Sequence, residues 1–129
     1  MKFTRTLAAA FGAALLAGPA LAAEGPFTQA QLDKGGSEYN THCRTCHAAK
    51  GKGALGPALT GDQFKGRFGG QTAADVRSWI HQNMPQTAPG SLNDDQLNVL
   101  MAYILSLNGY TPGQTEMSPD SAKTVTIEK

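Results

Sequence analysis

The chain has little of what several large classes of protein require. It has two cysteines, too few for a disulfide framework or for a zinc site with four thiolate ligands. Its 11 Lys and Arg residues nearly balance its 10 Asp and Glu residues, so it lacks the basic field that nucleic-acid binding needs. It contains no apolar run of about 20 residues, so no transmembrane helix is expected. No convincing strand pattern is present, and an all-α fold is predicted.

The first 22 residues are predicted to be a secretory signal. Lys2 and Arg5 give a positive start, residues 7–17 are apolar or small, and Ala22 ends a small-x-small cleavage site. An uncleaved membrane anchor is the alternative. Cleavage after Ala22 would export residues 23–129 to the periplasm as a single domain, with no stable membrane insertion. Its nine basic and ten acidic side chains leave it nearly neutral.

The two cysteines stand in one short motif, Cys43-Arg44-Thr45-Cys46-His47. This spacing is typical of covalent c-type haem attachment, in which two thiols add to the two haem vinyl groups and the adjacent imidazole reaches the iron. A thioredoxin-like redox pair and half of a zinc site are the alternatives. The zinc site lacks a second ligand pair, and no βαβ pattern surrounds the motif as a redox pair would require. We therefore predict one covalent haem c, held by Cys43 and Cys46, with His47 as an iron ligand.

Three helices are expected around this cofactor. The first begins at Thr28 and contains a glycine pair, Gly35 and Gly36, over which Tyr103 is predicted to lie. The second runs from about residue 73 to 81, and the third follows Asn93 and stops at residues 108–109. Each start carries a capping-box pattern. The glycine-rich stretch 48–70 is predicted to be a loop, the core to span about 28–110, and the polar tail 111–129 to cross the surface or be loose.

The second iron ligand is predicted to be Met84. It lies just beyond the second helix and directly before Pro85, whose rigid backbone helps to fix a flexible thioether. His81 and an open coordination position are the alternatives. The remaining candidates are assigned to packing, to the tail or to the helix surface: Met101, Met117 and His42.

These motifs together resemble the small class I bacterial cytochromes c, which carry one haem with His and Met ligands. The resemblance covers about residues 30–110: the Cys-x-x-Cys-His motif, Gly56-Pro57-Ala58-Leu59, Met84-Pro85 and a terminal amphipathic helix. It implies a small cytochrome c fold, with three main helices and glycine-rich loops wrapped around one covalent haem. It also implies that the carbonyl of Pro57 accepts a hydrogen bond from His47 and so orients the imidazole.

A closer resemblance is to the cytochrome domains that accompany quinoprotein alcohol dehydrogenases. It rests on the segment 84–92, on residues 102–105 and on Asn108-Gly109. Those domains often carry a tryptophan where this chain has Phe68, and phenylalanine cannot donate a hydrogen bond to a haem propionate. Other propionate partners are therefore expected, and the nearest candidates are Arg67, Arg77 and Trp79.

The expected function is one-electron transfer rather than catalysis, because a six-coordinate iron leaves no position for a substrate. A dehydrogenase is the expected donor, for which the closer resemblance implies a quinoprotein, and an oxidase or other cytochrome is the expected acceptor. A fixed subunit of such a complex is the alternative, and a haem enzyme or sensor with a labile methionine is a third. Residues 43–77 hold six basic and two acidic side chains, which predicts a mildly positive face for docking.

Overall fold

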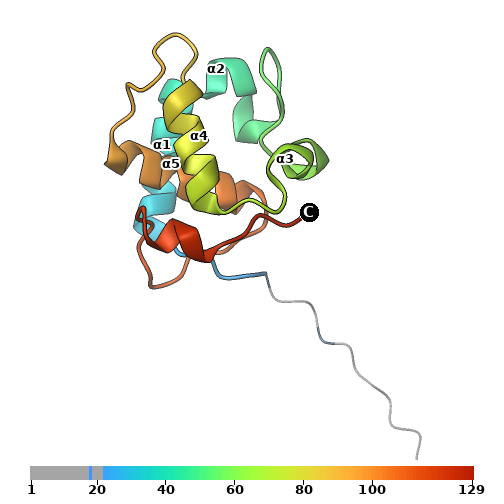
Figure 1. Cartoon of the computed structure of the whole chain (residues 1–129), viewed down its shortest axis with the longest axis vertical. Coiled ribbons are helices and arrows are strands. Elements are labelled where there is room, and N and C mark those ends of the chain that lie inside the picture. Colours follow the sequence, from blue (N-terminus) through green and yellow to red (C-terminus); the bar gives the residue numbers. More distant parts are fainter. Residues whose placement is uncertain (1–17, 19–21) are drawn as a thin grey trace, which may run out of the picture.

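The computed structural model describes residue 18 and residues 22–129, so the predicted signal segment lies outside the described residues apart from Gly18 and Ala22. The described chain forms these helices: α1 (Gln29–His42), α2 (Arg44–His47), η1 (Ala49–Gly51), α3 (Gly61–Phe68), α4 (Ala73–Asn83), α5 (Asp94–Leu107) and η2 (Ser121–Thr124) (Figure 1). Its β structure is limited to two isolated bridges, so the all-α class is confirmed. None of the helices in this part of the chain is long and apolar enough to cross a bilayer.

The three predicted helices are present as α1, α4 and α5, and each begins with the predicted capping box. In each, the cap side chain accepts a hydrogen bond from the third helical N–H, and the third side chain accepts one from the cap N–H. The three pairs are Thr28 with Gln31, Thr72 with Asp75, and Asn93 with Gln96. The helix starts therefore follow from local sequence chemistry.

The most extensive contact between helices in the described chain is that of α1 with α5, which cross at Gly35, and the prediction for Tyr103 is confirmed. A side chain at Gly35 would collide with the carbonyl oxygen of Val99 and lie 2.9 Å from the Cβ of Tyr103. Gly36 lies under the Tyr103 ring with ordinary van der Waals room. The ring of Tyr39 packs against that of Tyr103, with centroids 5.0 Å apart. Gly35 thus permits a backbone approach that any larger residue would prevent.

The prediction of a loop across residues 48–70 was wrong at its end, where α3 forms. This helix has eight residues, with glycine at its first and sixth positions, so its intrinsic helix propensity is poor. Its stability comes from packing: Phe64 and Phe68 share one face, are buried, and have ring centroids 5.2 Å apart. Two apolar residues one turn apart are too short a pattern to predict a helix.

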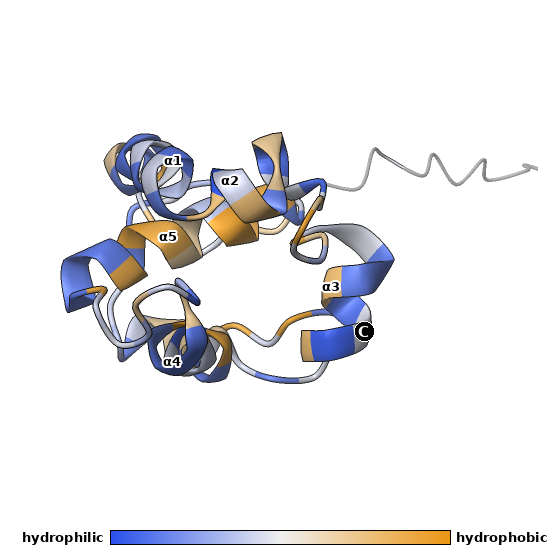
Figure 2. Ribbon diagram, turned by 90° about the horizontal axis from the view of Figure 1, so that it is seen from above, coloured by the Kyte–Doolittle hydropathy of each residue, from blue (hydrophilic) through white to orange (hydrophobic). Residues whose placement is uncertain are grey.

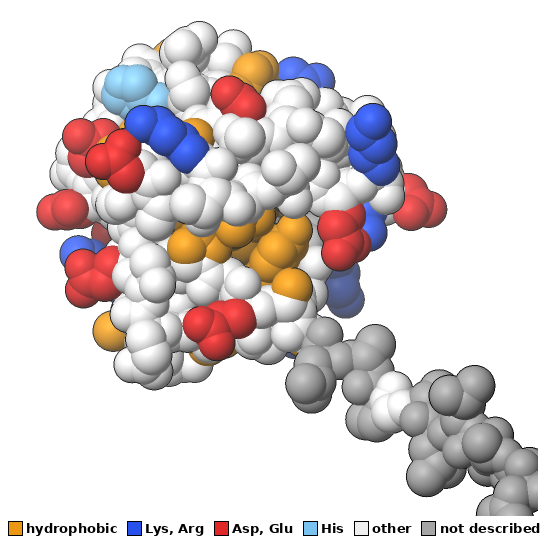
Figure 3. Space-filling view, turned by 60° about the horizontal axis from the view of Figure 1, so that its bottom comes forward, with side chains coloured by type: hydrophobic (Ala, Val, Ile, Leu, Met, Phe, Trp, Pro, Cys, Tyr) orange, Lys and Arg blue, Asp and Glu red, His pale blue; other side chains and the backbone are white. Residues whose placement is uncertain are grey.

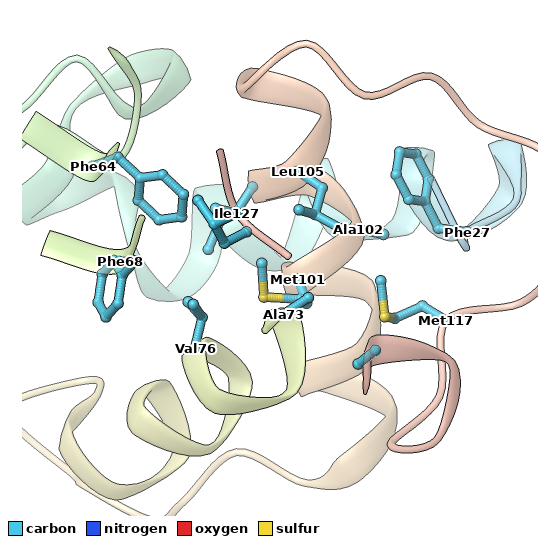
Figure 4. Packing of buried hydrophobic residues seen from close by; sticks show 12 residues of the cluster. Phe27, Phe64, Phe68, Ala73, Val76, Met101, Ala102, Leu105, Met117 and Ile127 are labelled. Carbon is cyan, nitrogen blue, oxygen red and sulfur yellow. The ribbon is translucent and has the colours of Figure 1, made fainter. Parts of the chain in front are cut away.

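The C-terminal segment, residues 111–129, crosses the surface, which is one of the two predicted arrangements, but it also contributes to the core. Met117 and Ile127 are buried in the same cluster as Met101 and Leu105 of α5 (Figure 4). The backbone of Ile127 bonds to that of Gly70 and Gln71, between α3 and α4. On the face turned forward in Figure 3, hydrophobic side chains gather in the middle and acidic side chains stand around them.

Candidate functional site

A cavity of about 750 Å³ lies among the helices. Its lining comes from the C-terminal end of α1, from α2, α3, α4 and α5, and from the loops at 55–59 and 84–92. Figure 2 shows the ribbons of α2, α3, α4 and α5 arranged in a ring. Most lining side chains are apolar, among them Phe64, Val76, Leu100 and Ile104. The predicted site residues also line it: Cys43, Cys46, His47, Pro57 and Met84. Predicted site residues up to 41 positions apart in the sequence, Cys43 and Met84, are therefore brought to one apolar space.

His47 is held in one orientation by its neighbours. Its Nδ1 lies 2.7 Å from the carbonyl oxygen of Pro57, which is the contact that the family resemblance implied. A carbonyl only accepts, so Nδ1 carries the proton and Nε2 keeps its lone pair for a metal. Gly56 packs flat against the ring, since a Cβ there would lie 2.8 Å from Cε1. His47 is buried, with 7% of the residue's surface exposed, and its ring is fixed from two sides.

The two thiols are unpaired and differ in environment. Cys43 is half-buried, while Cys46 is exposed. Burial raises the pKa of the Cys43 thiol to about 11, with smaller contributions from Cys46 and Glu38. The thiol of Cys43 is therefore protonated at neutral pH in this packing, and a protonated thiol is a weak nucleophile.

The structure separates Met84 from the other candidates for the second iron ligand. Met84 caps the end of α4 and lines the cavity. His81 is exposed and does not line it. Met101 and Met117 are buried in the hydrophobic core, as packing residues are. His42 touches the cavity, but its Nε2 lies 3.2 Å from Glu38 and 3.3 Å from the Gln96 amide.

Two residues that support His47 were not predicted as site residues. The Tyr39 hydroxyl donates to the carbonyl of Ala48, the residue that follows His47. The backbone N–H of Gly56 donates to the carbonyl of Cys46 at 2.8 Å. Tyr39 lies one turn before Cys43 on the same helix face, and this spacing was the only available sign of its role.

The three predicted propionate partners are placed differently. Arg67 and Trp79 both line the cavity, and the Arg67 guanidinium carbon lies 4.4 Å from the Trp79 ring centroid. Arg77 does not line it, because its guanidinium binds Asn98 and Asp94 on α5. Phe68 meets the Trp79 ring edge-on, at 5.6 Å, and offers no donor.

The donor set fits a covalently held haem. Two free thiols, a buried imidazole with an available Nε2 and a thioether line one apolar cavity. Cys43 and Cys46 would hold the porphyrin, and His47 with Met84 would face the iron. A soft sulfur opposite an imidazole is the ligand pair that raises the reduction potential of haem iron relative to two histidines.

Comparisons with known proteins agree with this donor set. The family model described as cytochrome c oxidase, cbb3-type, subunit III matches residues 30–104. The cbb3-type cytochrome c oxidase subunit CcoP of Azospirillum sp. (strain B510) is 34% identical over 92 residues, an alignment that covers 58% of this chain and 30% of CcoP. The chain thus spans less than a third of that relative's length.

The fold also matches a solved structure. The sulfane dehydrogenase SoxCD from Paracoccus pantotrophus superposes with a TM-score of 0.62, over 82% of this chain and 60% of the SoxCD chain. The sequence identity is 19%, so this likeness concerns the fold.

Proposed function

The chain belongs to the cbb3-type cytochrome c oxidase subunit III family of cytochrome c domains, and from that premise we propose that it is a periplasmic carrier between a dehydrogenase and an oxidase. It is a class I monohaem cytochrome c with covalent haem c, and its role is electron transfer. The single observation that best supports the proposed carrier function is the convergence of Cys43, Cys46, His47 and Met84 on one apolar cavity.

Each residue has a separate task in this proposal. The haem supplies iron that cycles between two oxidation states. His47 would ligate the iron through Nε2, while Pro57 holds the proton on Nδ1 and so fixes the ring. Met84 would supply the second ligand. The apolar walls keep water away, which raises the cost of the more highly charged oxidised state.

The axial pair is tested with three methionine or histidine variants. Met84→Ala should give high-spin or His-ligated iron and a lower reduction potential, because the soft sulfur is lost. His81→Ala should leave the absorption spectrum and potential unchanged. Met101→Leu is the matched control, since it removes a thioether from the core and not from the cavity. An unchanged low-spin spectrum in Met84→Ala, with an altered one in His81→Ala, would assign the ligand to His81.

Attachment is tested on the holoprotein. Both thiols should be consumed, so thiol titration should find none free, and acid-acetone should extract no haem. Cys43→Ala and Cys46→Ala should each leave at most one thioether and greatly lower the yield of holoprotein. Haem that acid-acetone removes from the unaltered protein would refute attachment at Cys43 and Cys46.

Export is tested by mass. Cleavage after Ala22 predicts an exported protein whose intact mass equals residues 23–129 plus one haem. A mass that retains residues 1–22 would contradict cleavage and support the membrane-anchor alternative.

The proposed docking face lies beside the cavity. Leu55, 86% exposed, is a lining residue, and the nearby Lys50 and Lys52 are exposed. Neither lysine has an ion-pair partner among residues 22–129, whereas Lys65 and Arg77 pair with Glu128 and Asp94. An apolar centre flanked by unpaired cations suits a brief encounter with an acidic redox partner.

A fixed subunit is the second candidate, because the Azospirillum relative is described as an oxidase subunit and is longer than this chain. Size-exclusion chromatography of a periplasmic extract separates the two. A carrier elutes alone at the size of one domain, and a subunit elutes with its complex. Mixing the oxidised carrier with periplasmic and membrane fractions then identifies its donor, with a quinoprotein dehydrogenase as the first to test. Mixing the reduced carrier with the same fractions identifies its acceptor.

A further inference from the structure

The cavity contains one permanently charged side chain. Among the described residues that line it, Arg67 is the only Lys or Arg, and no Asp or Glu is present. Haem carries two propionate carboxylates, and a carboxylate that leaves water needs a cation or strong hydrogen-bond donors. The lining therefore offers an anionic ligand one obvious partner.

Arg67 is held in place without using its hydrogen bonds. Its guanidinium carbon lies 4.4 Å from the centre of the Trp79 ring and 5.4 Å from that of Phe68. Stacking on an aromatic face leaves the N–H groups free, because they point outward in the guanidinium plane. Within residues 22–129 this side chain makes no hydrogen bond or ion pair, so its donors remain available.

The neighbouring cations are not equivalent. Arg77 donates to Asn98 at 2.9 Å and to Asp94 at 2.7 Å, and it lies outside the cavity lining. Lys65 pairs with Glu128 of the C-terminal segment at 3.2 Å and also lies outside the lining. Lys65 lies on α3 with Arg67, and Arg77 lies on α4 with Trp79, so both are matched controls.

We propose that Arg67, stacked on Trp79, binds a haem propionate and keeps that carboxylate ionised across the neutral pH range. The inference rests on the haem-carrying function proposed above and adds a residue to it. Arg67 is then a cofactor-binding residue that sets how the reduction potential depends on pH. An ionised propionate favours the oxidised iron, so its protonation raises the potential; a nearby guanidinium moves that protonation to lower pH.

The test is redox potentiometry of the holoprotein between about pH 4 and 9. This range runs from the reference pKa of a carboxyl group to well above that of histidine. Arg67→Gln should move the pH-dependent step of the potential upward by about one pH unit or more, because an opposite charge within a few ångströms shifts a carboxyl pKa by that much. Arg67→Lys should restore part of the shift. Trp79→Phe, which weakens the stacking and keeps an aromatic ring, should give a smaller shift of the same sign.

Other titrating groups at the cavity are controlled separately. His42, which faces Glu38 of α1 and Gln96 of α5, is replaced in His42→Gln to identify any step of its own. His47 and the two thiols are committed to the haem in the holoprotein. Arg77→Gln and Lys65→Gln remove a positive charge without removing a cavity donor, and should leave the position of the step unchanged.

The outcomes are distinct. A pH profile of Arg67→Gln that superimposes on those of Arg77→Gln and the unaltered protein, with normal haem content and axial spectrum, would overturn the inference and leave the carrier function standing. A shifted step in Arg77→Gln, with none in Arg67→Gln, would show that Arg77 binds the propionate and would overturn the assignment to Arg67. Absence of covalent haem from the unaltered protein would instead contradict the proposed function itself.

Discussion

The hydroxyl of Tyr39 donates a hydrogen bond to the carbonyl oxygen of Ala48 at 2.7 Å. This bond joins α1 to the turn that directly follows His47. The turn is backbone-strained, because Ala48 and Lys50 have φ angles of 59° and 54°. The hydroxyl thus helps to hold an unfavourable conformation next to the residue that is predicted to ligate iron.

Removing this hydroxyl is expected to weaken the fold. Tyr39→Phe leaves the carbonyl of Ala48 without its partner and should lower the free energy of unfolding of the holoprotein by about 1 kcal/mol. Denaturant unfolding followed by circular dichroism measures it. Tyr103→Phe is the control, since that hydroxyl makes no hydrogen bond within residues 22–129. Equal losses in the two variants would show that the Tyr39 bond has no special weight.

The two adjacent glycines of α1 should respond in opposite ways to the same substitution. Gly35→Ala forces a methyl group into the Val99 carbonyl and should destabilise the protein by about 1–3 kcal/mol, the usual penalty of overpacking. Gly36→Ala meets only the Tyr103 ring, at 3.4 Å, and gains helix propensity, so stability should hold or rise by up to about 1 kcal/mol. Thermal unfolding of both variants checks this. Similar melting temperatures would contradict the close crossing.

Acid should remove a contribution that links α4 to α5. The hydrogen bond and charge of Arg77 lower the pKa of Asp94 below its usual range. A carboxyl whose pKa is lowered on folding stabilises the folded state above its unfolded pKa, and this contribution disappears as the pH falls through the lower, folded pKa. The stability difference between the unaltered protein and Asp94→Asn should therefore be largest near neutral pH and should shrink in acid. Urea unfolding at several pH values measures it, with Asp95→Asn as the control for net charge.

Salt should slow the reaction with the physiological redox partner. At 0.15 M ionic strength the Debye length is about 8 Å, so attraction between charged faces is largely screened. The double variant Lys50→Glu and Lys52→Glu should lower the second-order rate constant further in stopped-flow mixing, while leaving the absorption spectrum nearly unchanged. Lys123→Glu is the control, because Lys123 lies in η2 and pairs with Asp120. A rate constant that is flat across ionic strength would point to apolar docking or a permanent complex.

Local patterns in the sequence predicted the elements that depend on local chemistry. The helix starts at Thr28, Thr72 and Asn93 each combine a cap with its partner three residues later, and each is found as predicted. Met84 was placed from its neighbours in the sequence and Pro57 from the family resemblance, and both line the cavity, Pro57 in contact with His47. The assignment of Met84 to iron stays a prediction.

What sequence patterns did not predict depends on contacts between distant segments. Helix α3 forms because Phe64 and Phe68 are buried against other elements, and its sequence has no periodic apolar run that would predict a helix. Met117 and Ile127 are single apolar residues in irregular backbone, so they carry no period from which burial could be predicted. The choice between Arg67 and Arg77 likewise depends on α5, whose Asp94 occupies only one of them.

The crossing of α1 and α5 also determines how the chain is tethered. A hydrogen bond between Gln96 and Glu38 joins these helices across 58 positions, and most of the cavity wall lies on the loop that this contact closes. The entropy of closing such a loop grows only with the logarithm of its length, by about 0.6 kcal/mol for each doubling. The closure entropy therefore changes little when an exposed loop between the two helices is lengthened or shortened. The contact between α1 and α5 can thus close the cavity for exposed loops of different lengths.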